Sequence, residues 1–456
     1  MNTNGRASPL ARLMQAASRI RPNELSATLL STLFVFVLMT AYFMLRPARD
    51  AMASDWTDAE VSTLWTINFF ISLAAVAVYG FAASNVRFRW LVPSVYVFFA
   101  LSFFLFFAGT TLVPDPVLID KSFYVWLSVF ALFHLSVFWS FMSDLFNKEQ
   151  APRLFGFIAM GSSIGAIAGP LIAGMTADLI DEKQLMLISA AMLFVPVPIV
   201  LALQRLKATR LGNESLEADL SRQTLGKNPF SGFAIFFTSP FLLGIAAFIL
   251  LYVAISSFIY FEQKNLLADF ARADRREILA WVDLTVNTLA ILTAAFVTGR
   301  LTTRLGMPLT LALVPAIVVI GMLVLAVSPI LAVVLGLQVT RRAGNYAITR
   351  PGREMLFTVV DREARFKAKP VIDIVFYRGG DAIWAWAFTG LTTAFGLGLG
   401  AVAAIGALIA AIWAGVGVYL GRSFNRMEDK HKVAIEALGE SALGEAEKGR
   451  QVQGAS

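Results

Sequence analysis

Two neighbouring arginines lie inside a stretch that is otherwise apolar enough to cross a bilayer. They belong to a set of polar residues at helical spacing, most of which share one face: Gln338, Arg341, Arg342, Asn345 and Thr349. A charge in the middle of a bilayer costs roughly 3 kcal/mol, so this pair requires a partner or water. Arginine forks suit phosphate and carboxylate groups, which favours an anion site facing a wet cavity. The alternative is a structural ion pair with a carboxylate, that of Asp283, Asp373 or Asp381.

The residues that follow add acidic and aromatic groups. Asp373, Tyr377 and Asp381 lie at positions i, i+4 and i+8 of a helical pattern, with Arg378 beside the middle one. Their carboxylates could couple a proton to transport, or they could only neutralise the arginines. The sequence leaves both interpretations open.

The composition places these charges in a membrane protein. Hydrophobic residues make up 57% of the 456-residue chain and charged residues only 15%, which is too little polar surface for a protein in water. Several apolar segments approach the roughly 20 residues that a helix needs to cross the hydrocarbon layer. We therefore predict an all-α membrane protein with about twelve transmembrane helices in two six-helix pseudo-repeats.

Apolar and polar segments divide the chain into five regions. We predict a cytoplasmic N-terminal segment (1–24), an N-terminal six-helix bundle (25–203), a cytoplasmic linker (204–238), a C-terminal six-helix bundle (239–422) and a hydrophilic cytoplasmic tail (423–456). Basic residues gather in the connections of one side, which places both termini in the cytoplasm and the protein in a bacterial cytoplasmic membrane. This topology explains the net charge of +7, so no nucleic-acid partner is expected.

The two halves echo each other at the ends of their helices. "YFMLRPARD" ends the first span and "YFEQKNLLAD" the seventh, so Tyr42 aligns with Tyr260 and Arg46 with Lys264 on the external side. Charged residues also gather at the internal joins of spans four and five and of spans ten and eleven. In transporters built from two repeats the substrate site lies between them near the midplane, so these charges could form alternately closed gates.

The sequence gives little support for metal binding, enzymatic catalysis or ATP-driven pumping. Cysteine is absent and the two histidines are isolated, so we expect no metal site, no cofactor and no catalytic residue. The chain has no Walker motif for binding phosphate, so no ATP-driven pump is expected. It has no nucleophile elbow and no histidine cluster at metal-binding spacing, so no enzyme is expected. Gly161, Gly165 and Gly169 form a GxxxGxxxG pattern, which predicts close packing between helices.

Three segments resemble a known family of nucleotide transporters. "REMLFTVVDREARFKAKPVID" resembles the signature region of the ATP/ADP translocases of plastids and intracellular bacteria. Its matching residues are Arg353, Glu354, Met355, Asp361, Glu363, Lys367, Lys369 and Asp373. "YFMLRPARD" is similar to the end of the family's first span, with matches at Leu45, Arg46, Arg49 and Asp50.

The third segment, "FWSFMSDLFNKEQAPRLFGFIAMGSSIGA", resembles the family's join of spans four and five. It departs from the family at Gln150, where a second acid is usual after Glu149. Glu262 matches a family glutamate, and "GRLTTRLG" resembles a loop of the major facilitator superfamily with Thr303 in place of the usual Asp. The resemblance runs from the first span to the eleventh. It implies a major-facilitator-like fold and the exchange or uptake of nucleotides, with the aligned basic residues near phosphates.

We predict a monomeric secondary active transporter that works by alternating access in the lipid bilayer. Its substrate would be an anionic, phosphorylated metabolite, with nucleotide exchange or uptake favoured. The predicted substrate-binding residues are Arg46, Arg49, Arg341, Arg342, Asn345 and Lys369. The predicted gating and coupling residues are Asp50, Asp144, Glu149, Arg153, Glu262, Lys264, Glu354, Asp361, Lys367, Asp373 and Asp381. The alternatives are a proton-coupled permease for another organic anion and a non-transporting membrane scaffold or sensor.

Overall fold

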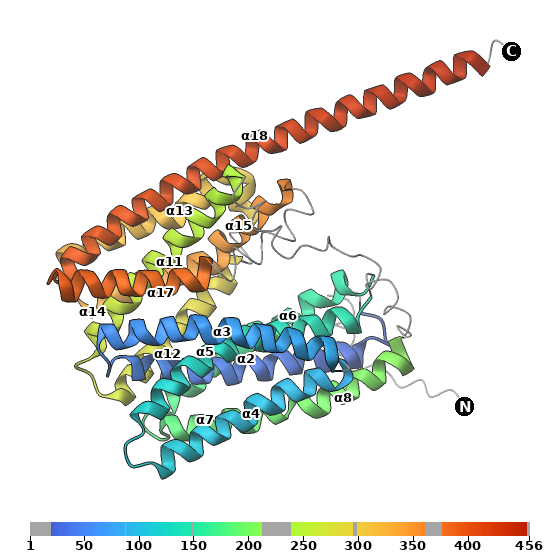
Figure 1. Cartoon of the computed structure of the whole chain (residues 1–456). Helices are drawn as coiled ribbons and strands as arrows, with labels where there is room; N and C mark the ends of the chain where they lie inside the picture. Colours follow the sequence, from blue (N-terminus) through green and yellow to red (C-terminus); the bar gives the residue numbers. More distant parts are fainter. Residues whose placement is uncertain are drawn as a thin grey trace.

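The computed structural model describes residues 20–86, 88–147, 149–211, 239–294, 299–360 and 376–453, and within these ranges its regular structure is all helical. Twelve helical segments cross the bundle in these ranges (Figure 1). Nine of the helices in the described ranges are long and apolar enough to span a membrane. The prediction of an all-α membrane protein with about twelve spanning segments is confirmed.

The first half of the chain contributes the blue to green helices of Figure 1. They are α2 (Leu25–Ala53), α3 (Asp58–Asn85), α4 (Phe88–Leu112), α5 (Val117–Leu145), α6 (Ala151–Met175), α7 (Glu182–Phe194) and α8 (Pro196–Leu206). Pro196 separates α7 from α8, because proline lacks the amide that would continue the helix ladder. A π-helical turn, η1 (Lys207–Leu211), extends α8 beyond the predicted end of the bundle at residue 203.

The second half contributes the yellow-green to red helices. They are α11 (Pro240–Leu267), α12 (Arg272–Thr293), α13 (Gly299–Val327), α14 (Leu331–Gly344), α15 (Arg350–Leu356), α17 (Tyr377–Thr389) and α18 (Leu399–Gln453). The π-helical turns η4 (Asn345–Thr349) and η7 (Gly390–Ala394) join α14 to α15 and extend α17. Gly306 has a φ of 72° and bends α13, a conformation that favours glycine.

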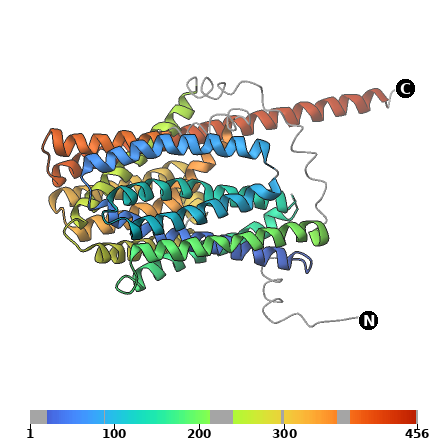
Figure 2. The same ribbon diagram turned by 60° about the horizontal axis from the view of Figure 1, so that its bottom comes forward.

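The long helix α18 extends well beyond the bundle. It runs without interruption from Leu399 to Gln453, through the predicted start of the tail at residue 423 (Figure 2). The segment that follows Gly421 is rich in Ala and Glu, which are strong helix formers. The predicted hydrophilic tail therefore continues the last spanning helix.

Glycines bring α2 and α6 into backbone contact. A Cβ atom added to Gly161, Gly165 or Gly169 would lie 2.3, 2.5 or 2.7 Å from the backbone oxygen of the facing residue on α2. Real Cβ atoms do not approach an oxygen that closely, so only glycine fits at these positions. The packing prediction from the GxxxGxxxG pattern is confirmed. Because α2 carries Arg46 and Arg49, this contact also helps to position the site.

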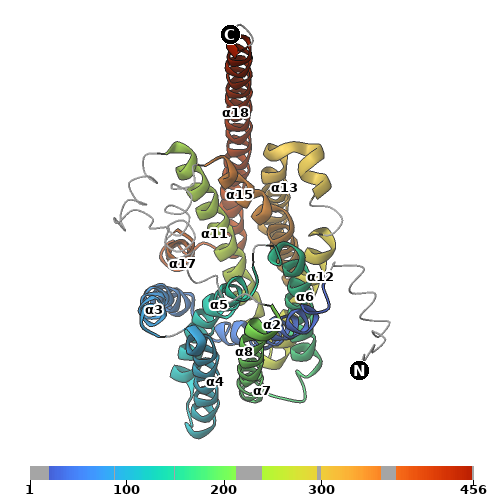
Figure 3. The same ribbon diagram turned by 90° about the vertical axis from the view of Figure 1, so that its right-hand side faces the viewer.

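The two halves meet at one end of the bundle and diverge toward the other (Figure 1). Between the halves, α3 packs against α17, and α12 packs against α2 and α6. Figure 3 looks along the helices and shows α3, α4, α7 and α8 on one side, with α11, α13, α15 and α18 on the other. We call the end where the α2–α3 and α11–α12 connections lie the closed end. The start of α2 and the last turns of α18 lie toward the opposite end.

Candidate functional site

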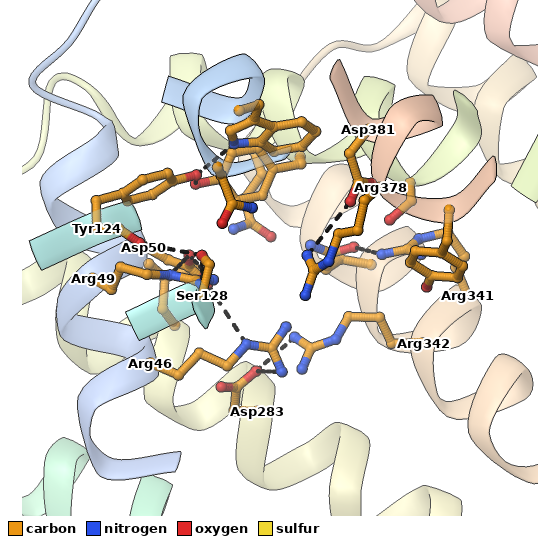
Figure 4. A pocket seen from close by; sticks show the side chains of 18 of the residues that line it. Arg46, Arg49, Asp50, Tyr124, Ser128, Asp283, Arg341, Arg342, Arg378 and Asp381 are labelled. Atoms are coloured by element: carbon orange, nitrogen blue, oxygen red, sulfur yellow. Dashed lines mark hydrogen bonds and ion pairs between the residues drawn. The ribbon is translucent and has the colours of Figure 1, made fainter. Parts of the chain in front are cut away.

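A polar cavity of about 220 Å³ lies between the two halves (Figure 4). The first half contributes side chains from α2, α3 and α5, and the second half from α11, α12, α14, η4 and α17. Its charged lining residues are Arg46, Arg49, Asp50, Asp283, Arg341, Arg342, Arg378 and Asp381. Many of these side chains come from α12, α14 and α17, which are not among the nine apolar helices of the described ranges. These polar side chains therefore line the cavity and are not placed in the lipid.

Helix α2 presents three charged residues to the cavity within one turn. Arg49 donates to Asp50 Oδ1 from Nη2 at 2.6 Å and from Nε at 2.9 Å. Its Nη1 donates to Ser128 Oγ at 3.1 Å on α5. Arg46 lies one turn before Asp50, with Nε 3.8 Å from Asp50 Oδ2. The spacing i, i+3 and i+4 explains why these side chains gather on one face of the helix.

Asp283 connects the two halves at the floor of the cavity in Figure 4. Its Oδ1 lies 2.6 Å from Nη1 of Arg342 and 3.8 Å from Nη1 of Arg46. Arg46 comes from the first half and Arg342 from the second, so one buried carboxylate serves a cation on each side. Among the described residues, the buried Nε of Arg46 and the buried Nε and Nη2 of Arg342 have no hydrogen-bond acceptor. Such donors are costly to leave unmatched, and they suit an anion entering the cavity.

The remaining arginines have weaker or neutral partners. Arg341 donates to Gln338 Oε1 at 2.6 Å and to the Tyr252 hydroxyl at 3.2 Å, and both partners are uncharged. Arg378 lies 3.6 Å from Asp381 on the same helix. The sequence left open whether the arginine pair forms an anion site or an ion pair. Both features occur here, because Arg342 is paired with Asp283 and also lines the cavity.

Aromatic side chains line another side of the cavity. Tyr124 of α5 and Tyr260 of α11 share a hydrogen bond of 2.9 Å across the two halves. The indole of Trp65 donates to the same Tyr124 hydroxyl at 2.7 Å. Gln263 also lines the cavity, and within the described residues its buried Oε1 has no donor. The aromatic rings and the Gln263 oxygen therefore add an apolar surface and a hydrogen-bond acceptor to the charged lining of the cavity.

Ion pairs across the closed end lock the two halves together. Lys264, on α11, lies 2.9 Å from Asp58 Oδ1 and donates to the Trp56 carbonyl at 2.7 Å, and both partners belong to the first half. The predicted gating position of Lys264 thus faces the other half. Glu262 is fully buried beside it, and neither carboxylate oxygen has a hydrogen-bond donor among the described residues.

A second set of closed-end contacts was not predicted from the sequence. Arg272 and Arg275, in the first turn of α12, both pair with Asp55 of the α2–α3 connection. Arg276 donates to backbone carbonyls of Thr176, Ala177 and Ile180 at the end of α6. Basic residues usually gather on the cytoplasmic side of a membrane protein, so three arginines on the predicted external side are unusual. This unusual placement could have indicated that they form specific contacts.

Acid is expected to weaken the closed end through Asp55. Burial raises the pKa of its carboxyl, but hydrogen bonds and charge from Arg272 and Arg275 outweigh burial and lower it. With the halves apart the pKa would return toward about 3.9. Asp55 therefore stabilises the contact between the halves at the closed end when the pH is above about 3.9. This stabilisation is lost as pH falls through the lowered pKa of Asp55.

Spin labels at Leu179→Cys and Asp269→Cys, on exposed connections of the two halves, report this opening as a longer distance. We expect an increase below about pH 4 that is absent between pH 7 and 5. The Asp55→Asn variant should already show part of the longer distance at pH 7. A distance that stays constant down to pH 3 in the parent protein would contradict this role of Asp55.

Several predicted gating residues at the opposite end pair within the first half. Arg153 forms two hydrogen bonds with the fully buried Glu24 carboxylate, at 2.8 and 3.1 Å. Burial raises the pKa of Glu24, but the bonds to Arg153 and the Arg21 amide outweigh it and lower the pKa. Asp144 pairs with Lys207 at 2.8 Å, and Glu149 is exposed. Both ion pairs, Arg153 with Glu24 and Asp144 with Lys207, lie within the first half.

The other predicted site residues are distributed as follows. Arg46, Arg49, Arg341 and Arg342 line the cavity, together with Asp50 and Asp381, which were predicted to gate. Asn345 is buried in η4 and is not among the lining residues, and Glu354 pairs with Arg353 at 3.1 Å. Four predicted residues lie outside the described ranges: Asp361, Lys367, Lys369 and Asp373. The sequence interpretation missed several lining residues: the aromatic residues Trp65 and Tyr124, and the amides Asn68 and Gln263.

Comparisons with known proteins agree on the fold. The nucleoside transporter NupG has 14 to 15% identity with this chain, TM-scores of 0.56 and 0.57, and coverage of 88 to 89% of this chain and 99% of that one. A bacterial homologue of the human lysosomal transporter Spinster, solved in an inward-facing and unoccupied conformation, has 14% identity and a TM-score of 0.56, with 90% of this chain and 99% of that chain covered.

No curated protein matches the chain, and the resemblance to the ATP/ADP translocases stays a prediction. The sequence pattern described as Major Facilitator Superfamily matches residues 31–351, most of the chain. This match, with nine helices of spanning length in the described ranges, indicates a multi-pass membrane protein of a transporter family. The chain belongs to the Major Facilitator Superfamily.

Proposed function

We propose that this protein is a secondary active transporter for an anionic, phosphorylated metabolite. The observation that carries the proposal is the cavity between the halves, where Arg46 and Arg342 share one carboxylate and keep buried donors unmatched among the described residues. Arginine is well suited to phosphate, because its planar fork donates two parallel hydrogen bonds. The resemblance of three segments to the ATP/ADP translocases favours nucleotide exchange or uptake.

Alternating access follows from how the charges are divided between the halves. A phosphate that binds Arg46 and Arg342 together takes over from Asp283 and draws the two halves toward each other. Release on the other side then requires separation at the closed end, where Lys264 meets Asp58. Two-repeat transporters rock around a central site in this manner. The substrate thereby couples one gate to the other.

The proposed topology places the closed end outside the cell. Two six-helix units, residues 25–203 and 239–422, would be joined by a cytoplasmic linker at 204–238 in a bacterial cytoplasmic membrane. Both termini would then lie in the cytoplasm, with the protein acting as a monomer. The bias of basic residues toward one side supports this orientation. The Spinster homologue named above, whose fold is similar, was solved facing inward.

Ligand-induced stabilisation tests the proposal. A panel of nucleotides and other organic phosphates is added to purified protein, and a ligand at 100 times its Kd should stabilise the fold by about 2.7 kcal/mol. The best ligand is then used for counterflow in proteoliposomes. Arg342→Gln should weaken its binding by about 2 kcal/mol or more, because it removes one member of a buried charge pair.

Arg350→Gln provides the matched control, since Arg350 is exposed about two helical turns further along the chain. Its affinity and counterflow should equal those of the parent protein. The proposal fails if no anion in the panel stabilises the protein, or if Arg342→Gln binds the best ligand as tightly as the parent does.

A proton-coupled permease for another organic anion is the second candidate. Asp381 supports it, because this carboxylate lines the cavity and its Arg378 partner is 3.6 Å away. Such a permease accumulates substrate in response to an imposed pH gradient, and Asp381→Asn would abolish that accumulation while keeping counterflow. An exchanger shows counterflow without a response to the gradient.

A further inference from the structure

Among the described residues, the charged groups that line the cavity do not balance. Its described lining carries five arginines and three aspartates, which leaves two positive charges in excess. Two pairs are local, Arg49 with Asp50 and Arg378 with Asp381. The excess is therefore found among the other residues of the lining.

The first uncompensated charge is at Asp283, which faces both Arg46 and Arg342 but can neutralise only one of them. The second is Arg341, whose hydrogen-bond partners among the described residues, Gln338 and Tyr252, are neutral. Arg341 and Arg342 are 3% and 5% exposed, so water can reach little of either cation. A buried charge without a counter-charge is strongly disfavoured, and a bound anion removes that penalty only if its own charge matches the excess.

We infer that the site selects a compact metabolite with two negative charges on a single phosphomonoester group. This inference rests on the proposed function and names the substrate class of the same site. A phosphomonoester loses its second proton with a pKa of about 6, so it is a dianion at neutral pH and matches the excess. A nucleoside triphosphate would bring about four negative charges and leave about two of them uncompensated.

The geometry and the size of the cavity agree with the charge count. Arg46, Arg341 and Arg342 all line the cavity, and each keeps a buried donor unmatched among the described residues. A cavity of about 220 Å³ is smaller than the roughly 300–1,000 Å³ of sites for drug-sized ligands. The rest of the molecule would lie against the ring surface of Trp65 and Tyr260, where the Gln263 oxygen accepts a hydrogen bond. A sugar hydroxyl or a base amine could supply that donor.

Binding measurements at pH 7.5 test the inference with a series that differs in charge. The series contains the mono-, di- and triphosphates of one nucleoside, the methyl ester of the same monophosphate, and a hexose phosphate. We expect the monophosphate to bind about tenfold or more tightly than both the triphosphate and the singly charged methyl ester. The comparison with the hexose phosphate decides between a nucleoside and a sugar as the neutral part.

Charge variants should move the preference in opposite directions. Arg341→Gln reduces the excess to one and should make the methyl ester the better ligand relative to the monophosphate. Asp283→Asn raises it to three and should move the preference toward the diphosphate. Arg341→Lys keeps the charge and should keep the order of the parent protein. If Asp283→Asn is too unstable to purify, the Arg341 variants and the pH profile still decide.

In the parent protein, affinity for the monophosphate should fall as pH drops below about 6, toward that of the singly charged methyl ester, as the dianion takes up a proton. Affinity for the methyl ester should not show this dependence, because it has no second ionisation in that range. A triphosphate that binds more tightly than the monophosphate, or an unchanged order in Arg341→Gln, would overturn the inference while leaving phosphate transport intact. A complete lack of binding by every anion would instead remove the proposed function.

Discussion

Replacing Gly165 by leucine is expected to eliminate folded protein from the membrane. A Cβ at this position would lie 2.5 Å from the Phe36 carbonyl oxygen and 2.8 Å from the Met39 Cβ on α2. Both neighbours belong to the helix itself, so neither can move aside without separating α2 from α6. We expect a loss of about 4 kcal/mol or more, which is a large part of the stability of a typical domain. The measurement is the fraction of monodisperse protein after extraction, with the melting temperature of whatever remains.

Gly156→Leu is the matched control, because it lies on the same helix and a Cβ there would meet nothing within 4 Å. The substituted side chain is the same, so any general effect of leucine on α6 cancels. Gly156→Leu should yield protein at the parent level. Equal yields and melting temperatures for the two leucine variants would refute the claim that backbone contact at Gly165 holds α2 in place.

A disulfide between α3 and α17 is expected to stop transport completely and reversibly. The hydroxyls of Ser62 and Thr389 are 2.8 Å apart, both residues are buried, and they belong to different halves near the closed end. The chain contains no cysteine, so Ser62→Cys with Thr389→Cys leaves only one possible pair. Mild oxidation should form the bond, because the two side chains are in contact and each new sulfur replaces a hydroxyl that lies beside the other. A closed end that cannot separate prevents alternating access.

Counterflow in proteoliposomes should disappear on oxidation and return when a reductant is added. The control pair is Thr63→Cys with Thr389→Cys, because Thr63 is exposed and lies on another face of α3. This pair and the two single variants should transport at the same rate before and after oxidation. Full activity of the cross-linked Ser62/Thr389 variant would show that the two halves do not separate at this end during transport.

The architecture of the bundle could be predicted because it depends on composition and local pattern. Apolar segments of spanning length predict crossing helices whatever their neighbours are, and nine helices of the described ranges meet that criterion. The glycines of α6 indicated close packing through their spacing of four, and α2 does approach them. Arg341 and Arg342 indicated a polar environment, because the energetic cost of placing them in lipid is a property of the residues alone.

The pairing of charged residues between different helices could not be predicted from local sequence patterns. The gating interpretation of Asp50 was based on its place at the end of a predicted span, yet it pairs with Arg49 in the cavity. Asp283 was one of three possible partners for the arginine pair, and nothing in its local sequence indicated that it would also face Arg46. Asp55 and the arginines of α12 were not predicted to meet at all.

By itself, the sequence determined the membrane environment, the helical segments, the tight helix pair and the presence of buried cations, because each follows from the transfer energy or the shape of residues along one helix. Only the tertiary structure decided which carboxylate faces which arginine. Those distances depend on how helices far apart in the chain are rotated and aligned against each other. Rotating one helix about its axis would change the partners of all its side chains. The excess of two positive charges among the described lining residues, on which substrate selection is proposed to depend, therefore exists only in the assembled cavity.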